Sequence, residues 1–501
     1  MKVPVRVVAV VAAAVLALTA CSAGSGTSSG GSSPGGDQNL SIGLVAEPAS
    51  LDFTTTDGAA IPQALLGNVY ETLVKQDDSG KIVPSLAKSW TVSPDRKTYT
   101  FDLVANAKFT SDKPFTANDA VFSINRVKTA WTTSLKSAMD VVASAKALSP
   151  TQLQVTLAKP SNDWLFRMTT RIGAMFSETG VSALATTPIG TGPFKFSKWN
   201  RGDSIVLLRN DSYWGTKPFF QQITLKYFKD ATALNNALLT STINVIGTVQ
   251  APEALSQFTS NAKYQVIEGT TNGEVLLSFN NERPVFKDIR TRQAIRMAID
   301  HKALLDTCWA GRGKLIGSMV PPTDPWYEDL TGIAPYDLTK AKSLLQASGA
   351  AGKTLRLRLP TLPYATSCGQ VVKSMLEQAG LKVQIDQLEF PAAWLTTVFR
   401  NADYDMSIIA HVEPRDLGAV FNAKYYTRYN DPTLQADLAA ADAGDEATQI
   451  ADMKKAARRL SEQAAGDWLF LLPNLIVADK NVKGLPQNAI TENFDLSKLA
   501  R

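Results

Sequence analysis

The segment from residue 354 to 388 constrains the fold more than any other part of the sequence. Leucines alternate with charged residues in Leu355–Leu359, which is the period of a β-strand with one buried face. Residues 370–379 then place apolar side chains at helical spacing, and Gly380 follows as a helix-ending residue. The alternation returns at 381–385. A strand, a helix and a strand in about 35 residues predict a right-handed βαβ unit in a parallel sheet.

The rest of the chain mixes strands with helices. Asp119–Lys128 is predicted as a helix, since its apolar residues share a face and Thr116-Ala117-Asn118 precedes it as a cap region. No repeat of fixed period is visible in the sequence, which argues against a solenoid. The pattern predicts an α/β protein. Alternating apolar residues predict further strands at 40–44, 99–103, 153–157, 194–196, 205–208, 223–228, 403–409, 468–472 and 475–478.

Composition excludes several classes of protein. Only 19% of the 501 residues are charged, below the roughly 25% of an average globular chain. The 51 basic and 46 acidic residues are spread along the chain, without the concentrated basic excess of a nucleic-acid binder. Three Cys and two His leave little room for a cysteine-rich zinc site or for metal catalysis.

The first twenty residues read as a processing signal. Lys2 and Arg6 precede an apolar run from Val7 to Leu18, which is shorter than the about 20 residues of a membrane-spanning helix. The run leads into Leu18-Thr19-Ala20-Cys21, which resembles the bacterial lipobox, in which the Cys is lipidated. We therefore predict a lipoprotein signal peptide at 1–20 and a lipid on Cys21. An ordinary secretory signal with a chance Cys is the alternative.

The segment that follows supports an anchor. In residues 22–36, 12 of 15 are Gly or Ser, the composition of a flexible tether. Loss of residues 1–20 removes two basic residues and no acid, which lowers the net charge from +5 to +3. Cys308 and Cys368 then remain, and an oxidising exterior favours a disulfide between them. Two separate buried thiols are the alternative.

No catalytic motif stands out. The sequence has no phosphate-binding G-x-x-x-x-G-K-[ST], no H-E-x-x-H and no G-x-S-x-G. His301 lies in a polar interruption of a helix and is predicted to be solvated. His411 follows the strand at 406–409, where sheet edges often meet ligands, although a surface loop His is as plausible a reading. We expect no enzyme, no cofactor and no metal site.

Several segments, in order from about residue 40 to 480, resemble the extracytoplasmic solute-binding proteins of family 5, the peptide and nickel receptors of ABC importers. The blocks that carry the resemblance are Pro84–Trp90, Thr98–Phe101, Lys108–Ser123, Gly190–Phe196, Arg209–Gly215, Phe279–Phe286, Arg292–Asp300, Tyr336–Ala341 and the helix at 366–380.

The resemblance implies a two-lobed periplasmic-binding-protein-like fold of type II, of the large cluster C type, with an extra subdomain in lobe I. Lobe I would comprise residues 37–269 and 478–501, and lobe II residues 280–470. Hinge strands would lie near 270–279 and 471–477, with the ligand enclosed between the lobes.

The resemblance also suggests a ligand site. Peptide receptors of this family commonly pair a lobe II carboxylate with the ligand ammonium, and here that region is His411–Asp416. The family usually has Trp where His411 stands and Asp where Pro414 falls, so Glu413 or Asp416 would replace the acid. Tyr364 matches a ligand-facing Tyr of dipeptide binders, but Leu362 replaces their carboxylate-binding Arg. Longer peptides, or a different solute, are therefore favoured over dipeptides.

Five further residues are weaker candidates. Glu47, Ser50 and Asn280 could face the cleft, with loop or hinge structure as the alternative. Arg400 and Arg415 could meet an acidic ligand, although solvated surface positions are the more ordinary reading for both.

The resulting prediction is a lipid-anchored substrate-binding component of an ABC importer on the outer face of the cell membrane. It would capture oligopeptides as a monomer, deliver them to the permease and bind no nucleic acid. The alternative is that the same scaffold binds a metal chelate, an opine, a sugar or a haem-like solute. A secreted hydrolase is the third reading.

Overall fold

The computed structural model describes residues 38–501. The predicted signal peptide, Cys21 and the Gly/Ser tether lie outside the described residues. Within residues 38–501, no helix combines the length and the apolar character needed to cross a membrane.

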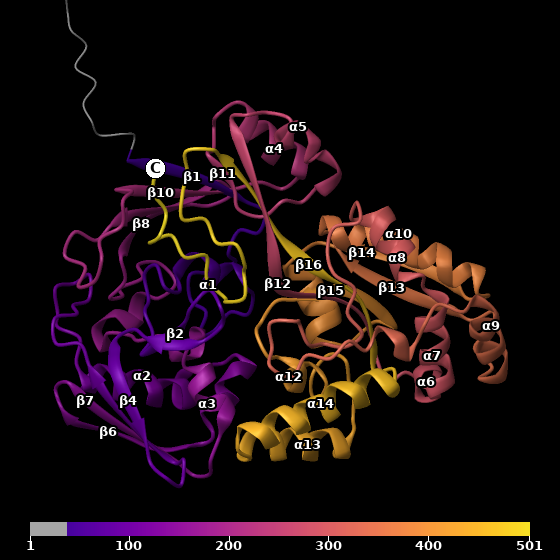
Figure 1. Cartoon of the computed structure of the whole chain (residues 1–501), viewed down its shortest axis with the longest axis horizontal. Helices are drawn as coiled ribbons and strands as arrows, with labels where there is room; N and C mark the ends of the chain where they lie inside the picture. Colours follow the sequence, from indigo (N-terminus) through magenta and orange to yellow (C-terminus); the bar gives the residue numbers. More distant parts are fainter. Residues whose placement is uncertain (1–37) are drawn as a thin grey trace, which may run out of the picture. The chain divides into compact units, whose positions relative to one another are not determined.

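Ten strands form one mixed sheet in the order β14-β13-β15-β12-β16-β11-β1-β10-β9-β8 (Figure 1). Four more form the sheet β4-β5-β7-β6, and β2 pairs with β3. The strands are β1 Asn39–Leu44, β2 Val74–Gln76, β3 Ile82–Pro84, β4 Ala87–Val92, β5 Thr98–Leu103, β6 Val142–Ser149, β7 Gln152–Leu157, β8 Phe194–Asn200, β9 Ser204–Arg209, β10 Gln222–Tyr227, β11 Val245–Ile246, β12 Tyr264–Phe279, β13 Thr354–Pro360, β14 Lys382–Leu388, β15 Met406–His411 and β16 Gly466–Asp479.

The helices are mostly short and lie between the strands in sequence. They are α1 Ala60–Leu65, α2 Ala117–Ala130, α3 Asn162–Arg167, α4 Ala231–Leu239, α5 Ser256–Thr259, α6 Pro284–Lys287, α7 Ile289–Ala298, α8 His301–Cys308, α9 Leu338–Ala347, α10 Pro363–Gln378, α11 Ala392–Trp394, α12 Leu417–Val420, α13 Pro432–Ala443 and α14 Glu446–Glu462. A π-helix at Leu395–Arg400 and five short 3-10 helices complete the set, among them Arg171–Gly173.

The predicted βαβ unit is confirmed. Strands β13 and β14 pair in parallel from Thr354↔Lys382 onward, and α10 connects them. The helix lies so close to the sheet that a Cβ at Gly369 would come 2.3 Å from a methyl carbon of Leu359. A disulfide between Cys308 and Cys368, with a Cα–Cα distance of 4.9 Å, joins α8 to α10.

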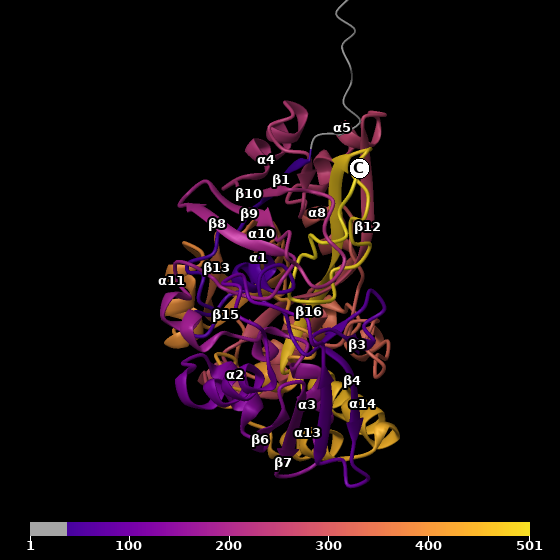
Figure 2. The ribbon, with the colours of Figure 1, turned by 90° about the vertical axis from the view of Figure 1, so that its left-hand side faces the viewer.

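The two largest hydrophobic cores lie at either end of the long sheet. The first core gathers buried side chains between Leu40 and Val245 and between Ile476 and Leu499. The second core gathers side chains between Val275 and Phe470. Strands β12 and β16 contribute to both sides and pair antiparallel over most of their length (Figures 1 and 2).

Two local expectations differ from the structure. The strands expected at 468–472 and 475–478 are one continuous strand, β16, because β12 pairs with it on both sides of Pro473. His301 is not fully solvated. It begins α8, and its Nε2 lies 3.0 Å from Oδ1 of the buried Asp467.

Candidate functional site

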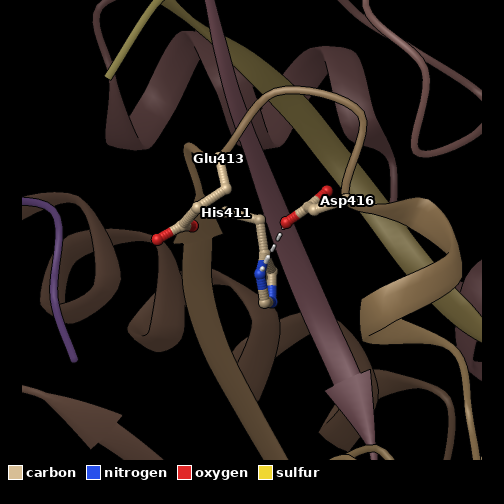
Figure 3. A group of neighbouring side chains, drawn as sticks. All are labelled: His411, Glu413 and Asp416. Carbon is tan, nitrogen blue, oxygen red and sulfur yellow. Dashed lines mark ion pairs between the residues drawn. The ribbon is translucent and has the colours of Figure 1, made fainter. Parts of the chain in front are cut away.

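The C-terminal end of β15 and the loop after it form the centre of the candidate site. His411 is the last residue of β15 and is 6% exposed. Its Nε2 lies 2.9 Å from the Tyr426 hydroxyl, and its Nδ1 lies 3.4 Å from Oδ2 of Asp416. Figure 3 shows Asp416, at the start of α12, turned toward the imidazole. The sequence expectation of a surface loop His at this position is therefore wrong, because the side chain is enclosed.

Glu413 connects this loop to the segment after α3. Its Oε1 lies 3.3 Å from Nη2 of Arg171, whose side chain is only 2% exposed. The same guanidinium lies 2.8 Å from Glu492 and donates a hydrogen bond to the carbonyl of Gly58. Arg171 therefore joins the β15–α12 loop to the segments that contain Gly58 and Glu492, both of which lie next to residues of the first core.

Arg415 makes a second connection. Its backbone adopts φ 57°, in the left-handed region, and its guanidinium carbon lies 3.9 Å from the centre of the Phe166 ring and 4.7 Å from that of Trp326. From α3, Arg167 donates hydrogen bonds to the carbonyls of Pro414 and Arg415, at 3.3 and 2.8 Å. Arg415 is thus held between two aromatic rings. The sequence-based expectation of a solvated surface position is wrong for this residue.

Asp57 belongs to the same electrostatic group. Burial raises its pKa, while Arg171 and Arg400 oppose that rise and Glu413 adds to it. Arg400, at the end of the π-helix, is exposed. The four charged groups come from four separate segments, which is typical of a binding site assembled by the fold.

Glu274 lies in β12 directly opposite His411 in the antiparallel pairing. Directly opposite residues point to the same face of a sheet. Glu274 is 3% exposed, and its Oε2 accepts no hydrogen bond within residues 38–501. Burial, and then the carboxylates of Asp416, Asp324 and Glu413, raise its pKa well above the ordinary value. This carboxyl group is enclosed among other acids.

A cavity of about 840 Å³ lies beside this loop. Its lining comes from the first-core side, including Asp163 and Arg167, and from the α12–α14 region, including Arg415, Tyr425 and Asp442. The volume falls within the roughly 300–1,000 Å³ of ordinary ligand pockets. Of the predicted site residues, only Arg415 lines it.

The remaining predicted residues lie apart from the loop cluster. The carboxylate of Glu47 accepts hydrogen bonds from the Trp199 indole and the Gly202 amide, and the Ser50 hydroxyl accepts one from the Asp52 amide. Asn280 donates to the carbonyls of Ala402 and Tyr404 and borders a separate hollow of about 410 Å³.

Tyr364 is 8% exposed, and its hydroxyl accepts a hydrogen bond of 2.9 Å from the Ala410 amide. This bond holds α10 against β15, next to His411. A role for Tyr364 in contact with ligand remains a prediction.

Sequence reasoning missed Asp57, Arg167, Arg171 and Glu274. A usable signal existed for two of them. Arg171 interrupts the otherwise apolar and small-residue run at 168–176, and Glu274 directly precedes the apolar run Val275–Leu277. A charged residue inside a buried segment is rare unless it is paired or functional.

His411, Glu413 and Asp416 have the spacing of a metal site, because one ligand atom from each lies within 4.8 Å of the others. Both imidazole nitrogens already face protein partners, and Glu413 is paired with Arg171. A metal ion would have to replace these contacts. The three residues offer suitable ligand atoms, but they are arranged as a network within the protein.

Comparisons with known proteins agree with this architecture. The nickel-binding periplasmic protein of Escherichia coli is 32% identical over 354 residues, covering 63% of this chain and 65% of that protein. A Brucella ovis protein named as an ABC transporter peptide-binding protein is 30% identical over 332 residues, covering 63% of this chain and 62% of its own length. The chain thus spans slightly less than two thirds of the length of these curated relatives.

Among solved structures, the periplasmic binding protein DppA of Helicobacter pylori, in complex with the peptide STSA, superposes with a TM-score of 0.83. The sequence identity is 23%, and the match covers 92% of this chain and 97% of that one. This likeness shows that the chain has the two-lobed α/β fold of the periplasmic binding proteins. The sequence profile of the family described as "Bacterial extracellular solute-binding proteins, family 5 Middle" matches residues 81–431. The chain therefore belongs to the family 5 bacterial extracellular solute-binding proteins.

Proposed function

We propose that this protein is the substrate-binding component of an ABC importer and that it captures oligopeptides between its two lobes. The observation that carries the proposal is the convergence of Arg171 and Glu413 from opposite lobes at the β15–α12 loop. Charged groups enclosed in this way interact more strongly than in water and can hold a solute without chemistry. Membership of the family and the names of its relatives support the same reading.

The proposal includes the lobe boundaries and the site. Lobe I is residues 37–269 with 478–501, lobe II is residues 280–470, and β12 and β16 supply the hinge. Within lobe II, Glu413 and Asp416 are the carboxylates proposed to meet the solute, in place of the family's usual Asp. We also propose that a lipid on Cys21 holds the monomeric receptor at the outer face of the membrane, where it meets the permease.

Binding without turnover is the outcome that tests the function. A random tetrapeptide library should raise the melting temperature of the purified protein, since a ligand at 100 times its Kd stabilises the folded state by about 2.7 kcal/mol. The peptides should be recovered intact by mass spectrometry. Glu413→Ala and Asp416→Ala should weaken retention, whereas the exposed-site variant Glu253→Ala should not.

Two results would count against the proposal. Absence of any thermal shift, with no peptide bound to the protein as purified, contradicts peptide capture. Unchanged retention in both Glu413→Ala and Asp416→Ala contradicts the carboxylate anchors alone.

A metal chelate is the second candidate solute, favoured by the close approach of His411, Glu413 and Asp416. Nickel chloride, with and without L-histidine, should then bind the wild-type protein and not His411→Ala, as measured by metal analysis after gel filtration. Equal metal retention in the two proteins would rule out this site.

A further inference from the structure

Glu274 is a buried carboxyl group at the site, and one of its oxygens is unpaired within residues 38–501. Glu274 is 3% exposed, and its Oε2 accepts no hydrogen bond from any residue in the described part of the chain. Leaving a buried polar atom unpaired is costly, and the cost is larger for a group that can ionise. This oxygen can therefore still accept a hydrogen bond or an ion pair from a group outside the protein.

The surroundings of Glu274 are acidic. Its strongest electrostatic neighbours are Asp416 and Glu413 from the β15–α12 loop and Asp324 from the segment before α9. The arginines nearby already have acidic partners: Arg171 with Glu413 and Glu492, Arg415 with Asp324, and Arg167 with Asp163. Asp416 lies 3.4 Å from His411. Among the described residues, no basic side chain forms an ion pair with Glu274, so acids outnumber bases around it.

The position of Glu274 suits contact with a solute. It lies on β12 opposite His411, the last residue of β15, where the site loop begins. Arg171 and Arg167 reach this loop from lobe I. A solute group bound beside Glu274 would therefore be enclosed when these contacts form.

We propose that Glu274 binds the positively charged group of the solute, together with Asp416, and thereby selects solutes that carry a cation. This inference rests on the proposed function. It names a residue outside the His411–Asp416 loop, where the family resemblance places the carboxylate that binds the ligand. Until a cation arrives, a proton on Glu274 avoids an uncompensated buried charge. The cation replaces that proton, which leaves to solvent.

The experiment uses a random tetrapeptide library and the same library N-acetylated, each retained by the full mature protein and quantified by mass spectrometry. Lysine-free peptides are used, so that acetylation removes the only amine. Wild-type protein should retain free-amine peptides about tenfold better than acetylated ones, as expected for a charge-assisted hydrogen bond in an enclosed site.

Glu274→Gln keeps the shape of the side chain and removes its charge, so it should reduce this preference to about twofold or less. Glu253→Gln makes the same change at an exposed position and should keep the wild-type preference. A melting temperature of Glu274→Gln at or above that of wild type shows that it folds. An unchanged preference in Glu274→Gln would overturn the assignment while leaving peptide capture intact.

Nickel chloride alone is the second probe. Retention by wild type that Glu274→Gln loses would also support the cation site and would identify a metal ion as its occupant. A wild-type protein that retains neither peptides nor nickel would overturn both the proposed function and the cation site. Equal retention of free and acetylated peptides by wild type would overturn only the cation site.

Discussion

Two buried carboxyl groups, Asp467 and Glu274, show how partners decide the charge of an acid. Burial alone would raise the pKa of Asp467, but His301 and Arg296 hold it below the ordinary value. Their nitrogens lie 3.0 and 3.3 Å from its Oδ1. Glu274 is equally enclosed but has acids as its main neighbours, so its pKa is raised. Asp467 is held in ion pairs within the protein, whereas Oε2 of Glu274 has no hydrogen-bond partner among the described residues.

The raised pKa of Glu274 predicts a pH-dependent effect of Glu274→Gln on stability. The folded state holds this proton more tightly than the unfolded state, so wild type should lose stability as pH rises above the unfolded value of about 4.3. The Gln variant has no such proton. Its melting temperature minus that of wild type should therefore increase with pH in ligand-free protein, as measured by differential scanning fluorimetry.

The control for this measurement is Glu253→Gln, whose difference from wild type should stay flat over the same pH range. A Glu274→Gln difference that is also flat from pH 4 to 8 would mean that the carboxyl titrates normally in the folded protein.

At the scale of elements, α8 and α10 are joined by the disulfide between Cys308 and Cys368, 60 positions apart in sequence. Both helices contribute buried side chains to the second core, and Tyr364 in α10 reaches Ala410 beside the site. The bond thus restrains the helix that supports β15. The sequence favoured this pairing because the first Cys is predicted to carry the lipid.

Replacement of both cysteines by serine should lower the free energy of unfolding by about 3–5 kcal/mol, because the cross-link limits the entropy of the unfolded chain. Chemical denaturation measures the change. A reducing agent should produce a similar loss in wild type and no loss in the double Ser variant. A wild-type denaturation curve that does not respond to a reducing agent able to reach the bond would contradict the expectation.

At the scale of the whole folded unit, residues 38–501, the contacts between α3 and α13 form a second set of bridges between the two proposed lobes. Oδ1 of Asp442 accepts hydrogen bonds from the Ser161 hydroxyl at 2.7 Å and from the Asp163 amide at 3.0 Å. Asn162 donates to the carbonyls of Ala441 and Gly444. These bonds lie beside the cavity and far in sequence from the proposed hinge strands. If β12 and β16 act as a hinge, these bonds should favour closure even without a solute.

Asp442→Ala should therefore shift the ligand-free protein toward open forms. Loss of two hydrogen bonds to a partly exposed carboxylate should weaken closure by about 1–2 kcal/mol. The radius of gyration from small-angle X-ray scattering should rise in ligand-free protein and fall again with bound solute. Asp437→Ala, on the same helix, is the matched control, and a scattering curve of Asp442→Ala identical to wild type would contradict the prediction.

The sequence by itself determined the local elements and the family. The alternation at Leu355–Leu359 and the helical spacing before Gly380 predicted the βαβ unit, because strand and helix periods are local properties of the chain. The ordered blocks from Pro84 to Ala341 indicated the family, which the match over residues 81–431 shows.

The tertiary structure alone decided the charges and partners at the site. Arg171 and Glu413 are 242 positions apart in sequence, and Glu274 meets His411 only through strand pairing. No local pattern indicates such partners, because they depend on how the segments pack. Packing also decides the partners of each carboxyl group. Asp467 is paired with Arg296 and His301, and Glu413 is paired with Arg171. Oε2 of Glu274 has no hydrogen-bond partner among the described residues.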